Sequence, residues 1–359
     1  MPSAPPDARL LVDQILGEAV SRKASDVHFE PTPAGLEVRF RVDGLLEAVQ
    51  AHDAQVGRSL VTRLMVMAHL LTYRLDVPQE GRASVALAGA PTPVDVRLSV
   101  MPTVHGLRAA VRMPADLVQP HRLEQLNLPA AVVAGLDRFA RGDAGMLILT
   151  GPAGSGKTTT IYALLQHVAA TSPGLSIVAL EDPVERQLAG VTQIEVSPFG
   201  ELTYERTLRS ILRQDPQVLM LGEIRDGATA SLAVQAALSG HRLVSTLHAA
   251  TPAGAVQRLI EMGVEPYQVT SALFGIVAQR LLRRKSSAGG YAGRLPAAEF
   301  VEMDDPLRQA VLRRADASEL RKIYAAQPAY RPMRDAAGDL LSTGLTDADE
   351  LRRVFGETS

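Results

Sequence analysis

A glycine-rich segment carries the clearest chemistry in this 359-residue sequence. Residues 151–158 read Gly-Pro-Ala-Gly-Ser-Gly-Lys-Thr and fit the pattern G-x-x-x-x-G-K-[ST] without a mismatch. Glycines let backbone N–H groups turn inward around an anion, and a helix that begins there adds its positive end. We expect Lys157 to neutralise nucleotide phosphates and Thr158 to bind a bridging Mg²⁺. The predicted nucleotide-binding residues here are Gly151, Pro152, Ala153, Gly154, Ser155, Gly156, Lys157, Thr158 and Thr159.

Acidic residues follow two apolar runs downstream of this segment. Glu223 comes after the run at 218–221, and Glu181 and Asp182 come after the run at 177–180. Hydrolysis of a bound nucleotide needs a group that orients water, and ligands of open α/β sheets bind at the carboxyl ends of strands. Many P-loop enzymes carry Asp before this Glu, whereas here the position is Gly222. Glu181 or Asp182 could replace that carboxylate near Mg²⁺, although solvated loop residues and helix caps remain alternatives.

Strands and helices alternate around these residues. Buried strands are predicted at 146–150, 177–180, 218–221 and 243–247, with helices at 158–170, 204–213 and 228–238 between them. This alternation predicts an α/β fold, a parallel sheet covered by helices on both faces. We assign residues 121–280 to this P-loop core and residues 281–359, which are broken by Gly and Pro, to a helical C-terminal extension.

The front of the chain has a different pattern. Helical spacing at 10–21 and 59–71 is mixed with strand patterns at 36–42, 85–87, 94–100 and 108–113, and residues 88–93 read as a hairpin loop. Residues 9–113 therefore predict a smaller N-terminal α+β domain. The Pro- and Ala-rich residues 1–8 are expected to be disordered, and residues 114–120 to form a linker.

Composition excludes several classes of protein. The 37 Lys and Arg against 39 Asp and Glu give a net charge of −2, so no overall basic field for nucleic acid exists. There is no Cys, which excludes disulfides, thiol nucleophiles and Cys-ligated zinc. No apolar run spans a membrane and no signal peptide is visible, so a cytoplasmic protein is expected.

Four segments of the core resemble the GspE/PilB-type secretion ATPases, the hexameric motors of type II secretion and type IV pilus assembly. They are the P-loop with its Thr158-Thr-Thr tail, an aspartate-box-like segment at 180–185, a Walker-B-like segment at 208–226 and a histidine-box-like segment at 239–248. The front domain adds similar segments at 24–31, 40–44 and 95–106. The resemblance spans about Leu10 to Phe355 and implies a RecA-like ATPase domain.

The resemblance assigns roles residue by residue. Glu223 matches the catalytic glutamate that polarises water, and the Gly222-Glu223 pair is the family's own form. Glu181 matches the acid near Mg²⁺ and the water. His248 matches a histidine that senses the γ-phosphate, and His241 opens the same box.

Four arginines complete the implied site. Arg97 and Arg112 match arginines that close over the nucleotide phosphates, and their planar, always charged groups suit the γ-phosphate. Arg209 and Arg213 are one helical turn apart and match arginines that line the site or a subunit contact. Each could instead be a solvated surface charge.

The resemblance also implies cofactors and partners. We expect ATP and Mg²⁺ but no zinc, because the family's tetracysteine element is missing after Arg280. We also expect a homo-oligomer, a hexamer, that lies peripheral to the inner membrane and works with an inner-membrane platform protein and a docking protein. The family's first N-terminal domain is not recognised, so docking is expected to differ. No specific nucleic acid is expected.

The expected function is ATP hydrolysis that powers the assembly of pilin-like fibres in type II secretion or a type IV pilus. One alternative is a nucleotide-gated scaffold with little turnover. Another is a pilus retraction or DNA-uptake motor of the same superfamily.

Overall fold

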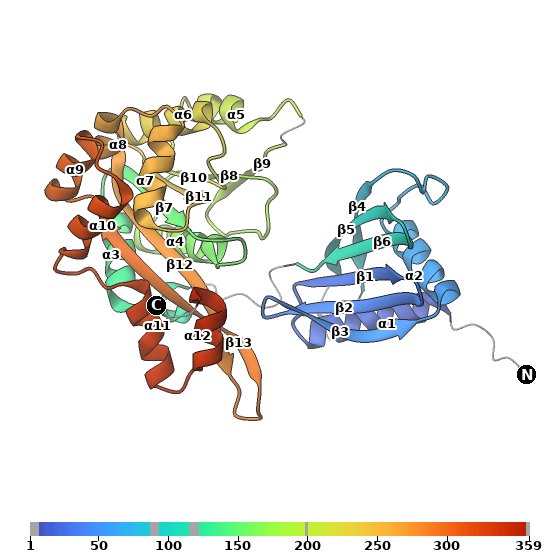
Figure 1. The fold of residues 1–359 in the computed structure, drawn as a ribbon. Coiled ribbons are helices and arrows are strands. Elements are labelled where there is room, and N and C mark those ends of the chain that lie inside the picture. The colour runs from blue at the N-terminus through green and yellow to red at the C-terminus, as the bar shows by residue number, and fades with distance from the viewer. Residues whose placement is uncertain (1–6, 87–92, 115–121, 198–199, 357–359) are drawn as a thin grey trace, which may run out of the picture. The chain divides into compact units, whose positions relative to one another are not determined.

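The computed structural model describes residues 7–86, 93–114, 122–197 and 200–356 (Figure 1). Two compact units divide at 119/120. That division falls within the predicted linker, of which residues 115–120 lie outside the described residues, as do residues 1–6 and 88–92 of the predicted disordered start and hairpin loop. Asp7 and Ala8 of the predicted disordered start are instead ordered, because Asp7 accepts a hydrogen bond from Arg9 N and caps the first helix.

Unit 1 is an antiparallel sheet with two helices on one face. Its elements are α1 (Ala8–Ser21), β1 (Asp26–Thr32), β2 (Gly35–Val42), β3 (Leu45–His52), α2 (Ala54–Met67), β4 (Gln79–Val85), β5 (Val94–Thr103) and β6 (Gly106–Arg112). The strand order is β3-β2-β1-β6-β5-β4.

Apolar and polar residues alternate along the strands of unit 1, which gives the sheet one buried and one more exposed face. Val94, Val96, Leu98 and Val100 of β5 all enter the core. Apolar residues of α1 and α2 recur at helical spacing and close this core from the other side. The residues between them, such as Arg97, lie on the sheet's other face.

Unit 2 is built on a seven-stranded, mainly parallel sheet with the order β13-β12-β7-β11-β10-β8-β9. Its strands are β7 (Gly145–Thr150), β8 (Ile177–Glu181), β9 (Thr192–Glu195), β10 (Val218–Leu221), β11 (Arg242–Leu247), β12 (Leu273–Lys285) and β13 (Tyr291–Glu302). The helices before β12 are η2 (Leu123–Leu126), α3 (Ala130–Arg141), α4 (Lys157–Thr171), α5 (Tyr204–Ile211), α6 (Gly227–Leu238), α7 (Pro252–Glu261) and α8 (Pro266–Ala272). Those after β13 are α9 (Asp305–Leu312), α10 (Ala317–Ala325), α11 (Met333–Ser342) and α12 (Ala348–Phe355).

Helices cover both faces of this sheet, as the alternation predicts. Met146 and Ile148 of β7 pack into one core with α6 and α7, whereas Leu147 and Leu149 pack into the other with α3 and α4. A strand buried on both faces needs a continuous apolar run, which is why the central strands were recognisable from the sequence.

The predicted helical extension at 281–359 is wrong at its start. Residues 281–302 continue β12 and form β13, an antiparallel hairpin that joins the core sheet, and β12 pairs in parallel with β7. The predicted boundary at 280 therefore cuts through a strand. The misleading signal was the charged and Gly-rich stretch at 283–290, which is the exposed end of the hairpin. Helices do follow from α9 onward.

Two elements of unit 1 have bounds that differ from the predicted ones. The strand predicted at 85–87 is β4, which lies earlier and ends at Val85, and α2 starts at Ala54 because Asp53 caps it.

Among the described residues, no helix is both long and apolar enough to cross a membrane.

Candidate nucleotide-binding and hydrolysis site

The loop at 151–156 joins β7 to α4 and takes a backbone form that glycine permits. Gly151 has φ 143° and Gly156 has φ 88°. A Cβ at Gly151 would lie 2.3 Å from the Gln279 carbonyl oxygen, and one at Gly156 would lie 2.7 Å from Gln279 Nε2. The loop therefore needs glycine at both places to close over the end of β7, where it turns its backbone toward the start of α4.

Within the described residues, no side-chain hydrogen bond is recorded for the Lys157 ammonium group or the Ser155 hydroxyl. Lys157 is 9% exposed, and its Nζ donates to the carbonyl oxygens of Gly151 (2.8 Å) and Pro152 (2.9 Å). Burial lowers the pKa of Lys157, and the negative charge of Glu223 partly opposes this. Ser155 Oγ is buried without a hydrogen-bond partner. The buried ammonium of Lys157, bound only to carbonyl oxygens, and the unpaired hydroxyl of Ser155 are consistent with a loop that binds phosphate.

Gln279 of β12 fastens the loop to the sheet and was missed in the sequence. Its Nε2 donates to the Ser155 carbonyl oxygen and its Oε1 accepts from Thr160 Oγ1, both at 2.9 Å. The residue is 2% exposed. A polar residue within the apolar run at 276–282 was the available signal, because such a group needs buried partners.

Glu223 follows β10 and lies between the side chains of Arg225 and His248. Its Oε2 lies 3.1 Å from His248 Nε2, and its Oε1 accepts from Arg225 Nε at 2.5 Å. Arg225 also lies 3.7 Å from Asp182, and the hydrogen bond to Glu223 raises the pKa of Arg225. The structure thus brings Glu223 and His248 together, as expected, and adds Arg225.

Glu181 ends β8 and is 3% exposed. One carboxylate oxygen accepts a short hydrogen bond from the Tyr162 hydroxyl, and the other accepts from Gln193 Nε2 at 2.8 Å. Burial raises the pKa of Glu181, and these two donors act against that rise. Tyr162 on α4 and Gln193 on β9 were not singled out from the sequence, because their role depends on contacts between separate elements.

The residues present fit Mg²⁺ that is bound together with a nucleotide. Among the described residues, no group of three or more His, Asp or Glu side chains could hold a metal ion by itself. Thr158 at the start of α4 and Glu181 at the end of β8 supply oxygen atoms at the carboxyl edge of the sheet. Phosphate oxygens and water would complete the shell that Mg²⁺ prefers.

Three expected residues are not brought to the loop. His241 precedes β11 and its Nδ1 lies 2.8 Å from the Ala236 carbonyl oxygen, at the opposite end of the strand from His248. Arg209 pairs with Glu205 on its own helix at 2.8 Å, and Arg213 lies exposed beyond the end of α5. In the part of the chain that the structure describes, no recorded hydrogen bond or ion pair joins these three to residues 151–158.

Arg97 and Arg112 lie directly opposite each other on β5 and β6 of unit 1. The same register places Arg82 of β4 beside Arg97, and Asp26 of β1 beside Arg112. Asp26 Oδ1 lies 3.2 Å from Arg112 Nε. The two predicted arginines therefore belong to a longer cross-strand row on one sheet face, to which Arg82 was not assigned from the sequence.

The chain matches the family described as "Type II/IV secretion system protein" over residues 3–353. The type II secretion system protein HxcR of Pseudomonas aeruginosa is 38% identical over 363 residues, covering 96% of this chain and 76% of the relative. The type II secretion system ATPase E of Vibrio cholerae is 37% identical over 385 residues, covering 97% and 75%.

Solved structures share the fold. The ATPase DotB of Legionella pneumophila superposes with a TM-score of 0.77 at 19% identity, covering 98% of this chain and 97% of that one. The pilus retraction motor PilT with bound ADP gives 0.69 at 24% identity, covering 95% and 96%. With its P-loop, its RecA-like unit and this match along nearly all of its length, the chain belongs to the type II/IV secretion system protein family.

Proposed function

We propose that the chain hydrolyses ATP to ADP and phosphate and uses the energy as a motor for assembling pilin-like fibres. The observation that carries this proposal is the pairing of a complete P-loop with a carboxylate at the end of β10. In the part of the chain that the structure describes, no ion pair joins Lys157 to an acidic side chain, and the negative charge of Glu223 favours its charged form. The machine we propose is a type II secretion system, which the names of the two relatives above support, or a type IV pilus.

In the proposed hydrolysis, different residues bind the phosphates, hold Mg²⁺ and activate water. The N–H groups of the loop and Lys157, which would leave its carbonyl partners, bind the phosphates, and Thr158 and Glu181 hold Mg²⁺. Mg²⁺ neutralises phosphate charge when bound. Glu223 orients water and takes its proton as the water oxygen bonds to the γ-phosphorus and the bond from that phosphorus to the ADP oxygen breaks. His248 lies beside Glu223, where it would contact the transferred γ-phosphate. Glu223 must first give up a contact with Arg225 or His248.

The arrangement of the whole machine follows the same proposal. We propose a hexamer in the cytoplasm, peripheral to the inner membrane, that acts on an inner-membrane platform protein and is tethered by a docking protein. We propose that Arg97 and Arg112 act on nucleotide phosphates, and that Arg209, Arg213 and His241 act at subunit contacts or at a neighbouring site. Nucleic acid is not a proposed partner.

A scaffold that binds ATP with little turnover is the second candidate. It is favoured by the contacts that occupy both oxygens of Glu223 in this structure. Turnover that rises when the protein assembles would favour the motor.

Substitution of Lys157 tests the site. Lys157→Ala should weaken ATP binding by about tenfold or more, since hydrogen bonds to charged groups contribute about 1.5–3 kcal/mol. Lys322→Ala removes an exposed lysine of α10 and serves as the matched control. ATP titration and phosphate release should separate the two variants. Equal behaviour of both would place the nucleotide elsewhere.

A further inference from the structure

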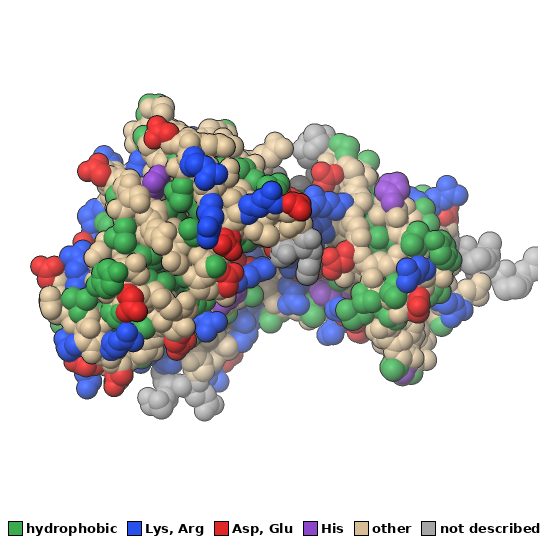
Figure 2. Space-filling view, turned by 90° about the horizontal axis from the view of Figure 1, so that it is seen from above, with side chains coloured by type: hydrophobic (Ala, Val, Ile, Leu, Met, Phe, Trp, Pro, Cys, Tyr) green, Lys and Arg blue, Asp and Glu red, His purple; other side chains and the backbone are tan. Residues whose placement is uncertain are grey.

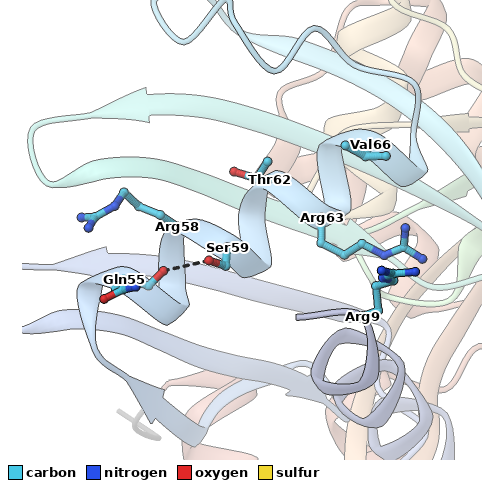
Figure 3. Close-up of a pocket in the computed structure, with 7 residues that line it drawn as sticks. All are labelled: Arg9, Gln55, Arg58, Ser59, Thr62, Arg63 and Val66. Carbon is cyan, nitrogen blue, oxygen red and sulfur yellow. Dashed lines mark hydrogen bonds between the residues drawn. The ribbon is translucent and has the colours of Figure 1, made fainter. Parts of the chain in front are cut away.

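Unit 1 carries a cavity of about 430 Å³ on the surface formed by its two helices (Figure 3). Arg9 of α1 and the outer face of α2 from Gln55 to Val66 line it. This surface is separate from the arginine row, which lies on the opposite side of the sheet from the helices. Neither the P-loop nor Glu223 contributes to it.

The cavity is lined by three arginines and no acidic side chain. Arg9, Arg58 and Arg63 all contribute, and α2 contains no Asp or Glu. Two acidic residues near the starts of the helices act mainly as helix caps. Asp53 caps α2 through the N–H groups of Gln55 and Val56, and Asp7, 3.9 Å from Arg9, caps α1.

Arg63 is the strongest sign of a missing partner. It is half-buried, and its Nε is buried without a hydrogen-bond partner. Figure 3 draws the Arg63 side chain extending toward the Arg9 end of the cavity. Like charges that line one cavity repel each other, and an unpaired buried donor costs free energy. An anion bound against the guanidinium groups would offset the repulsion and give Arg63 a charged partner.

We propose that this cavity binds a phosphate group carried on an organic molecule. Guanidinium groups match phosphate oxygens in two parallel hydrogen bonds. The hydroxyl of Thr62 adds a polar contact, and the exposed Val66 forms an apolar edge that a bare inorganic ion would not use. The volume falls within the range of organic ligand sites. A lipid headgroup and a soluble phosphate ester both carry such a phosphate and share this chemistry.

The test uses hydrogen exchange on the full chain in a Lys157→Ala background, which weakens the proposed P-loop site. The soluble probe is glycerol 3-phosphate. The lipid probe is phosphatidylcholine vesicles with and without phosphatidylglycerol. We expect at least one of the two phosphate probes to slow hydrogen exchange in α1 and α2. Protection by glycerol 3-phosphate alone identifies a soluble ester, and protection only by phosphatidylglycerol vesicles identifies a lipid headgroup.

Matched variants make the result specific. Arg58→Ser with Arg63→Ser should weaken binding about tenfold or more. Lys23→Asn with Arg74→Ser removes the same charge from exposed positions of unit 1 outside the cavity and should leave binding unchanged. If the double variant folds poorly, Arg58→Ser alone replaces it, because this position is exposed. The single variant should show a smaller loss of binding.

Two outcomes would overturn the proposal. One is that neither probe slows exchange in α1 and α2. The other is that the control pair weakens binding as much as the cavity pair does, which would indicate general charge attraction. Neither outcome depends on ATP hydrolysis, so this inference and the proposed function can fail separately.

Discussion

Glu181 has a defined partner for each carboxylate oxygen, and both partners come from other elements. Tyr162 on α4 and Gln193 on β9 donate to it within a buried environment. Burial favours the neutral acid, whereas the two donors favour the carboxylate. The proposed Mg²⁺ role needs the carboxylate, so these donors set the pH at which Glu181 can act.

Tyr162→Phe should move the acidic limb of the pH–rate profile to higher pH. Loss of the hydroxyl removes a contact that lowers the pKa of Glu181, so the pKa rises further and ionisation requires more alkaline solution. Stability should fall by about 1–3 kcal/mol, because a buried acceptor loses its donor. This deficit should grow as pH rises, since the ionised form depends most on the donor.

Phosphate release from pH 5 to 9 and denaturant unfolding would measure both effects. Tyr267→Phe, at an exposed tyrosine of α8, is the control and should change neither. An unmoved acidic limb in Tyr162→Phe would remove the assigned role of this contact.

At the residue scale, the sequence predicted groups whose chemistry is local. The P-loop consists of consecutive residues, so the spacing of its glycines, lysine and threonine was sufficient to predict it. Tyr162 and Gln279 were missed because their partners are 19 and at least 119 residues away in the chain. No local pattern encodes such pairings, although a glutamine directly after the apolar run at 276–278 indicates that one exists.

At the scale of elements, β12 has the largest consequence for the site. It lies beside β7 in the sheet and supplies Gln279, which binds the backbone of the P-loop and the side chain of Thr160. The central strands were predictable from their apolar runs. The far half of β12 and all of β13 were not, because charged and glycine residues there resemble a broken helical segment.

Gln279→Leu should weaken ATP binding several-fold and lower stability by about 1–3 kcal/mol. The leucine would leave the Ser155 carbonyl oxygen and the Thr160 hydroxyl without these partners inside the protein. Nucleotide titration and denaturant unfolding check the two effects. Gln309→Leu, at an exposed position of α9, should alter neither. Wild-type affinity in Gln279→Leu would show that the loop does not depend on β12.

At the scale of the whole molecule, each of the two units has its own hydrophobic core. Figure 2 shows Lys and Arg side chains interspersed with Asp and Glu side chains on the face in view, in keeping with a net charge of −2. The sequence predicted the two-unit organisation through a change of pattern. The continuation of the arginine row to Arg82 needed strand register, which the sequence does not give.

Arg112→Ala should reduce the rate of hydrolysis more than the affinity for ATP. An arginine that stabilises the charge of phosphoryl transfer contributes about 10³-fold or more to turnover, while the P-loop retains most of the binding. The control is Arg39→Ala, which removes an arginine from the same sheet face, in the neighbouring cross-strand row. Steady-state kinetics would give kcat and KM separately. A loss of affinity with unchanged kcat would assign Arg112 to binding alone.

Phosphate release by Glu223→Gln, with ATP binding and mass by light scattering measured on the same samples, tests the central claim most directly. Glutamine keeps the shape of the side chain but cannot take a proton from water. We predict that the variant binds ATP as wild type does, reaches the same assembled mass and loses about 10²–10⁴-fold in turnover. Equal turnover in the two proteins, when both are bound to ATP and assembled, would contradict the proposed hydrolytic role of Glu223.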